Sequence, residues 1–495
     1  MNPLKRLASQ TAVYGMSSVV GRFLNYLLVP LFTYTFAPAE YGVVAELYAY
    51  MGFLAVLLTF GLETGYFRFR SKGDWAPELV YATTLRVLVL GNLAFFVGLW
   101  LFRQPIADVL RHAQHPEYIW WCAAILALDS VGAVAFARLR AENRALRFAL
   151  IKVAEIGANI GLNLFFIVLC RQAFEATPDS LLGGLWNPAI GIGYVFLANL
   201  AASGFKLLLL SPELRGALGG FDQVLFRRLM RYSLPMVLIG LAGIVNEMLD
   251  RAALKYLLPF DNATNMAQLG IYSACYKLSV LMTLFIQAFR YAGEPFFFAY
   301  AKEADAGRTY ALVLNWFVIF CVFIFLLVTL FLDVFQYFVG AAYREGLGVV
   351  PVLLLANLLL GVYINLSIWY KLTDRTLMGA WVTLVGSAVT VVLLFWWVPI
   401  YGYAGAAWAH LACYTTMVAL SYALGRRYYP VPYELGRVLG YILLGLGIYG
   451  ISRFLVAGLD WQPAPTGTLL LGLFFTLVWL FDGRKLLHRP AAGGR

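Results

Sequence analysis

The sequence predicts an all-α polytopic membrane protein, and two observations lead to that class. Hydrophobic residues make up 62% of the 495 residues and charged residues only 13%. The mean hydropathy is +0.76, which excludes a disordered chain and an ordinary soluble domain. In addition, apolar stretches of about 20 residues, the length that crosses a bilayer, recur along the whole chain.

About fourteen apolar stretches are candidate transmembrane helices, because each is long enough to cross the hydrocarbon core. They cover residues 11–35, 41–66, 79–101, 117–137, 148–170, 189–210, 232–258, 267–292, 309–332, 347–370, 376–398, 402–424, 437–457 and 465–482. The last stretch is the weakest candidate, since it is short and follows the proline-rich turn WQPAPTG.

Charge in the predicted loops indicates the orientation. With both termini inside, most Lys and Arg residues lie in inner loops, and the outer loops hold only Arg103, Arg111, Arg171, Arg251, Lys255, Arg344 and Arg453. This asymmetry predicts cytoplasmic termini and an even number of spans. It also accounts for the net charge of +11 without nucleic acid binding, because the basic residues form no single patch.

A weak internal repeat predicts two lobes. Three residue pairs match at an offset of 228 between the second and eighth spans: Gly42 with Gly270, Tyr48 with Tyr276, and Gly65 with Gly293. We therefore expect six-helix lobes around a central cavity, followed by two more helices and a cytoplasmic tail, with boundaries at 1–215, 216–430 and 431–495. Parallel repeats with the substrate site between them are a known transporter plan.

Polar side chains occur inside several spans. A charge at the bilayer centre costs about 2.5–3.5 kcal/mol even on a lenient scale, so these side chains are expected to converge on a polar interior. In the eighth span one helix face carries Tyr276, Ser279, Thr283, Gln287 and Arg290.

Two basic residues, Arg22 and Lys277, lie well inside the first and eighth spans. They predict an anionic ligand, because Arg offers a fork of donors matched to phosphate and Lys a movable point charge. Asn25 shares the helix face of Arg22. For Arg290, near the cytoplasmic end of its span, snorkelling toward lipid headgroups is an equal alternative.

Seven further charged residues are candidates for a coupling-ion site or a gate: Glu46, Glu63, Asp129, Glu155, Glu247, Asp250 and Arg251. The carboxylates could carry a coupling H+ or bind a cation such as Na+, and the residues leave that choice open. Glu247 with Arg251, and Lys152 with Glu155, have the alternative interpretation of structural ion pairs.

Signals of metal, cofactor or soluble-enzyme chemistry are absent from the sequence. The five cysteines are scattered singly, which predicts neither a disulfide framework nor a metal site. His112 and His115 fall in a loop and are expected to be solvated. No Walker A, GxSxG, HExxH or dinucleotide motif occurs, so we expect neither a cofactor nor an enzyme.

Two blocks of the chain resemble a known family. They are TAVYGMSSVVGRFLNYLLVPLFTYTFAPAEYGVVAELYAY and RYSLPMVLIG with the NEMLDRAALKYLL, LGIYSACYKLSVLM and FRYAGEPFFF segments. The residues that carry the resemblance are Pro30, Glu40-Tyr41-Gly42, Pro235, Asp250-Arg251, Gly270-Ile271-Tyr272 and Glu294-Pro295-Phe296. The chain resembles the Wzx-type polysaccharide biosynthesis and O-antigen flippases of the multidrug/oligosaccharidyl-lipid/polysaccharide (MOP) exporter superfamily.

The resemblance implies twelve helices in two bundles around a V-shaped cavity, two further helices, and alternating access. The implied substrate is an oligosaccharide on polyprenyl diphosphate, moved from the cytoplasmic to the periplasmic leaflet of the bacterial inner membrane. Implied partners are membrane lipids, a polysaccharide polymerase and glycosyltransferases. In related lipid II flippases, cationic residues of the first and eighth helices line the cavity, and Arg22 and Lys277 occupy comparable places.

Two alternatives remain open. A cation-coupled multidrug exporter of the same fold would favour an acidic cavity, and the basic residues in spans 1 and 8 argue against it. A membrane polymerase or ligase would need a large periplasmic loop, whereas the predicted outer loops are short.

Overall fold

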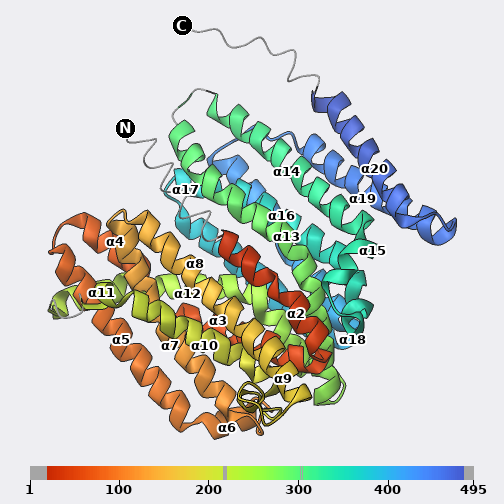
Figure 1. Ribbon diagram of the computed structural model, residues 1–495. Helices are drawn as coiled ribbons and strands as arrows, with labels where there is room; N and C mark the ends of the chain where they lie inside the picture. The colour runs from red at the N-terminus through yellow and green to blue at the C-terminus, as the bar shows by residue number, and fades with distance from the viewer. Residues whose placement is uncertain (1–18, 216–219, 302, 304, 484–495) are drawn as a thin grey trace. The chain divides into compact units, whose positions relative to one another are not determined.

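The computed structural model describes residues 19–215, 220–301, 303 and 305–483, and residues 11–18 of the first predicted span lie outside these ranges. The described residues form helices and connecting turns, with no β-strand among them (Figure 1). This confirms the all-α class. The chain packs as two compact units that meet in sequence at Gly270 and Ile271.

The first unit contains a helical segment at residues 19–26 followed by a series of helices. These are α2 (Leu28–Thr35), α3 (Pro38–Leu58), α4 (Leu62–Lys72), α5 (Pro77–Leu101), α6 (Arg103–Val109), α7 (Pro116–Ala141), α8 (Ala145–Asn163), α9 (Arg171–Ala176), α10 (Tyr194–Leu209), α11 (Ser211–Leu214), α12 (Gln223–Leu257) and the start of α13 (Asn262–Tyr300). A π-helical turn, η1 (Leu164–Cys170), joins α8 to α9.

The second unit contains the remainder of α13 and the helices that follow. These are α14 (Ala306–Leu330), α15 (Leu332–Phe335), the 3-10 helix η6 (Ala341–Val349), α16 (Val350–Leu366), α17 (Ile368–Leu372), α18 (Thr376–Tyr428), α19 (Leu435–Gly458) and α20 (Pro463–Val478). Within this unit α14 packs beside α19 and α20, and α16 packs along α18 (Figure 1).

Local sequence explains where several helices begin. Proline occupies the first turn of α3, α5 and α7, where its fixed φ suits the helix and its missing N–H costs nothing. The Asp222 carboxylate accepts a hydrogen bond from Leu225 N at 2.7 Å and caps α12. Asp261 caps α13 by accepting from Thr264 Oγ1 at 2.6 Å, and hydrogen bonds to this carboxylate lower the pKa of Asp261.

Twelve helices in the described part of the chain are long and apolar enough to cross a membrane. One of them, α18, has 53 residues and covers both the eleventh and twelfth predicted spans. Such a helix would be about 80 Å long if straight, more than twice the hydrocarbon core. It is not straight, because Gly402 interrupts it at φ 61° and ψ −142°, a conformation reserved for glycine. The total of fourteen spans stays a prediction.

The second predicted span, 41–66, is divided. Helix α3 ends at Leu58, and Phe60 and Gly61 both adopt positive φ before α4 begins at Leu62. The Gly61 turn is tight, since a Cβ there would lie 2.6 Å from the Ser233 carbonyl oxygen of α12. The break therefore lets α12 approach the α3–α4 junction.

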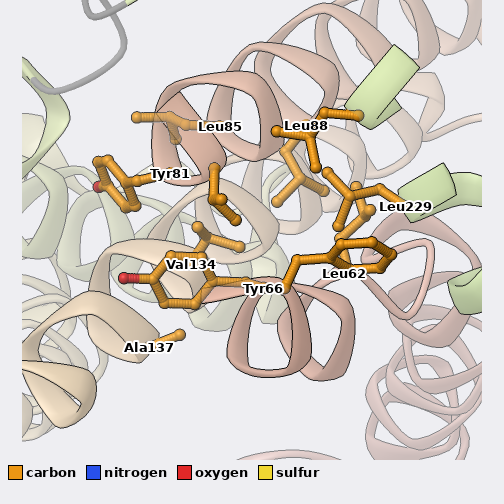
Figure 2. Packing of buried hydrophobic residues seen from close by; sticks show 11 residues of the cluster. Leu62, Tyr66, Tyr81, Leu85, Leu88, Val134, Ala137 and Leu229 are labelled. Carbon is orange, nitrogen blue, oxygen red and sulfur yellow. The ribbon is translucent and has the colours of Figure 1, made fainter. Parts of the chain in front are cut away.

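The apolar core of the first unit holds α4, α5, α7 and α12 together. Figure 2 shows Leu62 and Tyr66 of α4 against Tyr81, Leu85 and Leu88 of α5, with the other labelled side chains of this cluster contributed by Val134, Ala137 and Leu229. Tyr81 donates a hydrogen bond from its hydroxyl to the Glu213 carbonyl oxygen at 3.0 Å, which satisfies its one polar atom. The predicted lobe boundaries near residues 215 and 430 stay predictions.

Candidate functional site

A charge cluster joins α7, α8 and α10 inside the first unit. The Lys206 ammonium of α10 donates to Asp129 Oδ1 of α7 at 2.5 Å and to Glu155 Oε1 of α8 at 2.7 Å. Ser203, one turn before Lys206, donates to the same Asp129 oxygen at 2.7 Å. The structure thus brings together two predicted coupling-ion candidates around one buried lysine. We call Asp129, Glu155, Lys206 and Lys152 the three-helix charge cluster.

Lys152 completes the charge balance of this cluster. Its ammonium donates to Glu155 Oε2 at 3.1 Å and lies 4.8 Å from the Phe136 ring centroid. Two lysines therefore face two carboxylates, and the formal charges cancel. The predicted Lys152–Glu155 ion pair is present, and Lys206 extends it from one helix to three. Removing one member would leave a poorly solvated charge unpaired.

A row of amides continues from α8 to the first helical segment. Asn159 donates to Asn25 Oδ1 at 3.3 Å, and Asn163 donates to Asn159 Oδ1 at 3.2 Å. The two helices are close, because a Cβ on Gly21 would lie 2.5 Å from Ile156 Cδ1. The polar face predicted for the first span therefore packs along the polar face of α8.

Arg22 lies on this segment, one residue from Gly21 and one turn before Asn25. Its side chain is exposed, and no described residue forms a hydrogen bond or ion pair with it. By contrast, Lys152 and Lys206 are neutralised by carboxylates. Among the residues that the structure describes, none therefore occupies the guanidinium donors of Arg22.

A second charge cluster, which we call the outer charge cluster, consists of Glu46, His112 and Lys255. Lys255 donates to Glu46 Oε1 at 2.7 Å and to the Leu110 carbonyl oxygen at 2.5 Å. His112 Nε2 lies 2.8 Å from Glu46 Oε2. The side chains of Glu46 and Lys255 are 0% exposed and that of His112 is 8% exposed. The cluster fastens the α6–α7 connection onto α3 and α12.

Two sequence-based expectations are wrong here. His112 is buried and not solvated, because the loop after α6 folds back against α3. Lys255 is not an outer-loop charge, because it lies within α12 and its fully buried side chain pairs with Glu46 of α3. The available signal was Glu46, an acid inside the second span that needed a cationic partner. Nothing local in the sequence indicated which cation it would meet.

Two glycines bring α3 and α13 into contact beside this cluster. A Cβ on Gly42 would lie 2.1 Å from the Met266 carbonyl oxygen, and one on Gly270 would lie 1.9 Å from the Pro38 carbonyl oxygen. Only glycine permits such an approach of two backbones. The start of α3 and the first part of α13 therefore pack directly against each other within the first unit.

Among the remaining candidates of the first unit, Asp250 and Arg251 pair locally on α12, and Glu63 pairs across helices with Arg140. Arg251 donates to Asp250 Oδ1 at 2.7 Å and also to the main-chain carbonyl oxygen of Glu247. The Glu247 side chain is exposed. Glu63 of α4 accepts from Arg140 of α7 at 2.5 Å, and both side chains are partly exposed.

In the second unit, part of the predicted polar stripe of α13 faces α16 and α18. The Tyr276 ring centroid lies 6.1 Å from that of His410, and Ser279 Oγ accepts from Asn357 Nδ2 at 3.0 Å. Arg290 is exposed, with its guanidinium 5.9 Å from the Tyr291 ring centroid. Lys277 is half-buried in this unit. A cavity shared by Arg22 and Lys277 stays a prediction.

The five cysteines are all buried and free. Among the residues that the structure describes, no three His, Cys, Asp or Glu side chains are placed to hold a metal ion.

The fold, with its long apolar helices, defines a polytopic α-helical membrane protein. The structure is similar to that of the lipid II flippase MurJ in an inward closed conformation, with 13% identity, a TM-score of 0.67, and coverage of 97% of this chain and 99% of that one. It is also similar to a multidrug resistance MATE family transporter of the MOP superfamily in an inward-facing conformation, with 14% identity, a TM-score of 0.59, and coverage of 87% and 95%.

A third solved structure, the MATE multidrug transporter DinF-BH in complex with R6G, has 17% identity and a TM-score of 0.60 over 87% of this chain and 97% of that one. At these identities the likeness shows the fold. A search of curated protein sequences finds no match. The sequence model of the polysaccharide biosynthesis protein family matches residues 7–301. The chain belongs to that family, which confirms the resemblance seen in its sequence.

Proposed function

We propose that this protein flips a polyprenyl-diphosphate-linked oligosaccharide from the cytoplasmic to the periplasmic leaflet of the bacterial inner membrane. The cargo would supply assembly of a cell-surface polysaccharide such as O-antigen, capsule or exopolysaccharide. Membership of the polysaccharide biosynthesis family and the fold shared with a lipid II flippase support a lipid-linked cargo. Glycosyltransferases would make this cargo, and a polymerase would use it.

The observation that carries the proposal is Arg22. It is an exposed arginine inside the first predicted span, without a partner among the described residues, next to the Asn25–Asn159–Asn163 amides. A guanidinium matches a diphosphate in geometry and charge. Pairing the diphosphate with this cation in a low-dielectric site lowers the free energy needed to move the diphosphate charge across the membrane. Lys277 and Arg290 would provide further positive charge, and Tyr276 an aromatic surface for sugar rings.

We expect Arg22→Ala to abolish surface polysaccharide while the protein still reaches the membrane, because the diphosphate loses its bidentate partner. Arg22→Lys should retain part of the activity, since lysine keeps the positive charge but cannot make the bidentate hydrogen bonds of a guanidinium. Surface polysaccharide is measured on whole cells, and protein level by immunoblotting of membranes. Arg103→Ala, at an exposed position in a predicted outer loop, is the matched control. Wild-type polysaccharide in the Arg22→Ala strain would contradict the proposal.

Transport would proceed by alternating access without covalent catalysis, coupled to H+ or Na+. Asp129 is the most accessible carboxylate of the three-helix charge cluster, with 43% of its side chain exposed. Glu155 forms an ion pair with the same lysine, Lys206. Both are therefore proposed to bind the coupling ion. Collapsing the H+ gradient or the Na+ gradient separately, while flipping is followed in vesicles, distinguishes the two ions.

The second candidate function is cation-coupled export of drugs, since two of the similar structures are multidrug transporters. A deletion strain that loses drug resistance but keeps its surface polysaccharide would favour that function.

A further inference from the structure

A cavity of about 260 Å³ lies in the second unit, away from the residues assigned above. One wall comes from η6 and the start of α16 and includes Glu345 and Gly348. The other wall comes from α18 just after its kink and includes Tyr403, Ala407 and Trp408. In the predicted topology these segments lie at the outer ends of their spans.

Both walls are held by close packing. Tyr343 of η6 is fully buried, and its carbonyl oxygen accepts from Cys275 Sγ at 3.4 Å. A Cβ on Gly346 would lie 2.5 Å from Ile271 Cγ2, so η6 sits directly on α13. On the other side, a Cβ on Gly405 would lie 2.5 Å from the Trp397 carbonyl oxygen. The cavity is therefore preformed and does not depend on a loop.

The chemistry of the walls is mixed. The Glu345 carboxylate is exposed, and no described residue forms an ion pair or hydrogen bond with it. The neighbouring Arg344 directs its guanidinium toward the Gln336 and Val339 carbonyl oxygens. Trp408 is 51% exposed and offers a flat apolar surface, and Tyr403 adds a hydroxyl.

We infer that this cavity is a carbohydrate subsite that takes one neutral or amino sugar ring of the transported oligosaccharide. Sugar hydroxyls donate to the carboxylate, while the C–H face of the ring rests on the indole. The volume is slightly below the roughly 300–1,000 Å³ of sites for drug-sized ligands, which suits a single ring. The negative charge of Glu345 repels the diphosphate, so the subsite receives the sugar end of the cargo. The inference rests on the proposed function.

A photo-crosslinking experiment identifies the occupant. A photoreactive benzoylphenylalanine replaces Val352, which also lines the cavity, and cells that make the native polysaccharide are irradiated before the full-length protein is purified. The matched control carries the same group at Leu443, an exposed position on α19. A carbohydrate-bearing adduct at position 352 and not at 443 is expected. A phospholipid adduct, or no adduct, at position 352 would overturn the inference.

Filling the cavity tests its role in transport. No atom lies within 4 Å of a Cβ on Gly348, so Gly348→Trp can occupy the space without a backbone clash. Glu345→Gln should lower the rate of flipping in proteoliposomes by about 10-fold or more, as expected for losing hydrogen bonds to a charged group. Gly348→Trp should lower the rate as much, because the indole occupies the space of the sugar ring. Gly440→Trp on α19, at another glycine with open space, is the control and should flip at the wild-type rate.

Comparison with Arg22→Ala separates the two proposals. If Arg22→Ala abolishes flipping while Gly348→Trp and Glu345→Gln remain at the wild-type rate, the inferred carbohydrate subsite is contradicted and the proposed flippase function stands. If Arg22→Ala also retains the wild-type rate, the proposed function itself fails. Unfolding temperatures of the purified variants within a few degrees of wild type show that a loss of flipping is not a loss of folding.

Discussion

At the scale of single residues, the first unit places two lysines where neither water nor lipid can solvate them. Lys206 is held between Asp129 and Glu155, and Lys255 against Glu46. A buried ammonium is tolerated only when such partners surround it, and taking away one partner typically costs about 3–5 kcal/mol. These lysines therefore hold the helices around them together, whereas Arg22 forms no ion pair with any described residue.

Lys206→Met tests the structural part of that role. It leaves Asp129 and Glu155 facing each other without their shared cation, so we expect destabilisation of about 3–5 kcal/mol and a clear drop in the unfolding temperature of the detergent-solubilised protein. The double variant Lys206→Met, Asp129→Asn should recover much of this loss, because the Lys152–Glu155 pair remains and no charge is left unpaired. Lys72→Met, which removes an exposed ion pair with Asp74, should change stability by less than about 1 kcal/mol. An unchanged unfolding temperature for Lys206→Met would contradict this role.

At the scale of helices, contacts near the start of α3, the end of α12 and the start of α13 hold these elements together, and the predicted topology makes these their outer ends. The outer charge cluster ties α3 to α12 and to the connection between α6 and α7. The Gly42 and Gly270 contacts add a backbone approach that no larger residue allows. In an alternating-access cycle this arrangement would be the closed outer gate.

Glu46→Gln tests that gate. It removes the charge that neutralises Lys255, so we expect the outer ends of α3 and α12 to separate more often. A cysteine introduced at Ala49, which is buried in α3, should then react faster with a membrane-impermeant maleimide added to intact cells. Glu175→Gln, at an exposed pair with Arg171, is the control. Equal labelling rates in Glu46→Gln and wild type would show that the cluster does not hold the gate.

At the scale of the whole molecule, a fold shared with MurJ at 13% identity shows how little sequence identity this architecture needs. Within a bilayer every backbone polar group must be satisfied internally, so long apolar helices are retained while side chains diverge. The distribution of Lys and Arg among the loops then sets the orientation of the whole bundle.

We expect both termini in the cytoplasm. A green fluorescent protein fused after Arg495 should fluoresce, and alkaline phosphatase fused there should be inactive. Phosphatase inserted after Gln336, in a predicted outer loop, should be active. Active phosphatase at the C-terminus would show that the topology is the opposite of the predicted one. The proposed direction of flipping would then be reversed.

The sequence by itself determined the class, the family and most spans of this protein, because hydropathy and helix length are local properties. It also indicated that charges inside the spans must find partners. Only the tertiary structure decided which partners these are: Lys206 for Asp129 and Glu155, and Lys255 with His112 for Glu46. Those pairings join residues 51 to 209 positions apart, and they depend on how the loop after α6 folds and how α12 packs against α3. No periodicity in the chain encodes such distances.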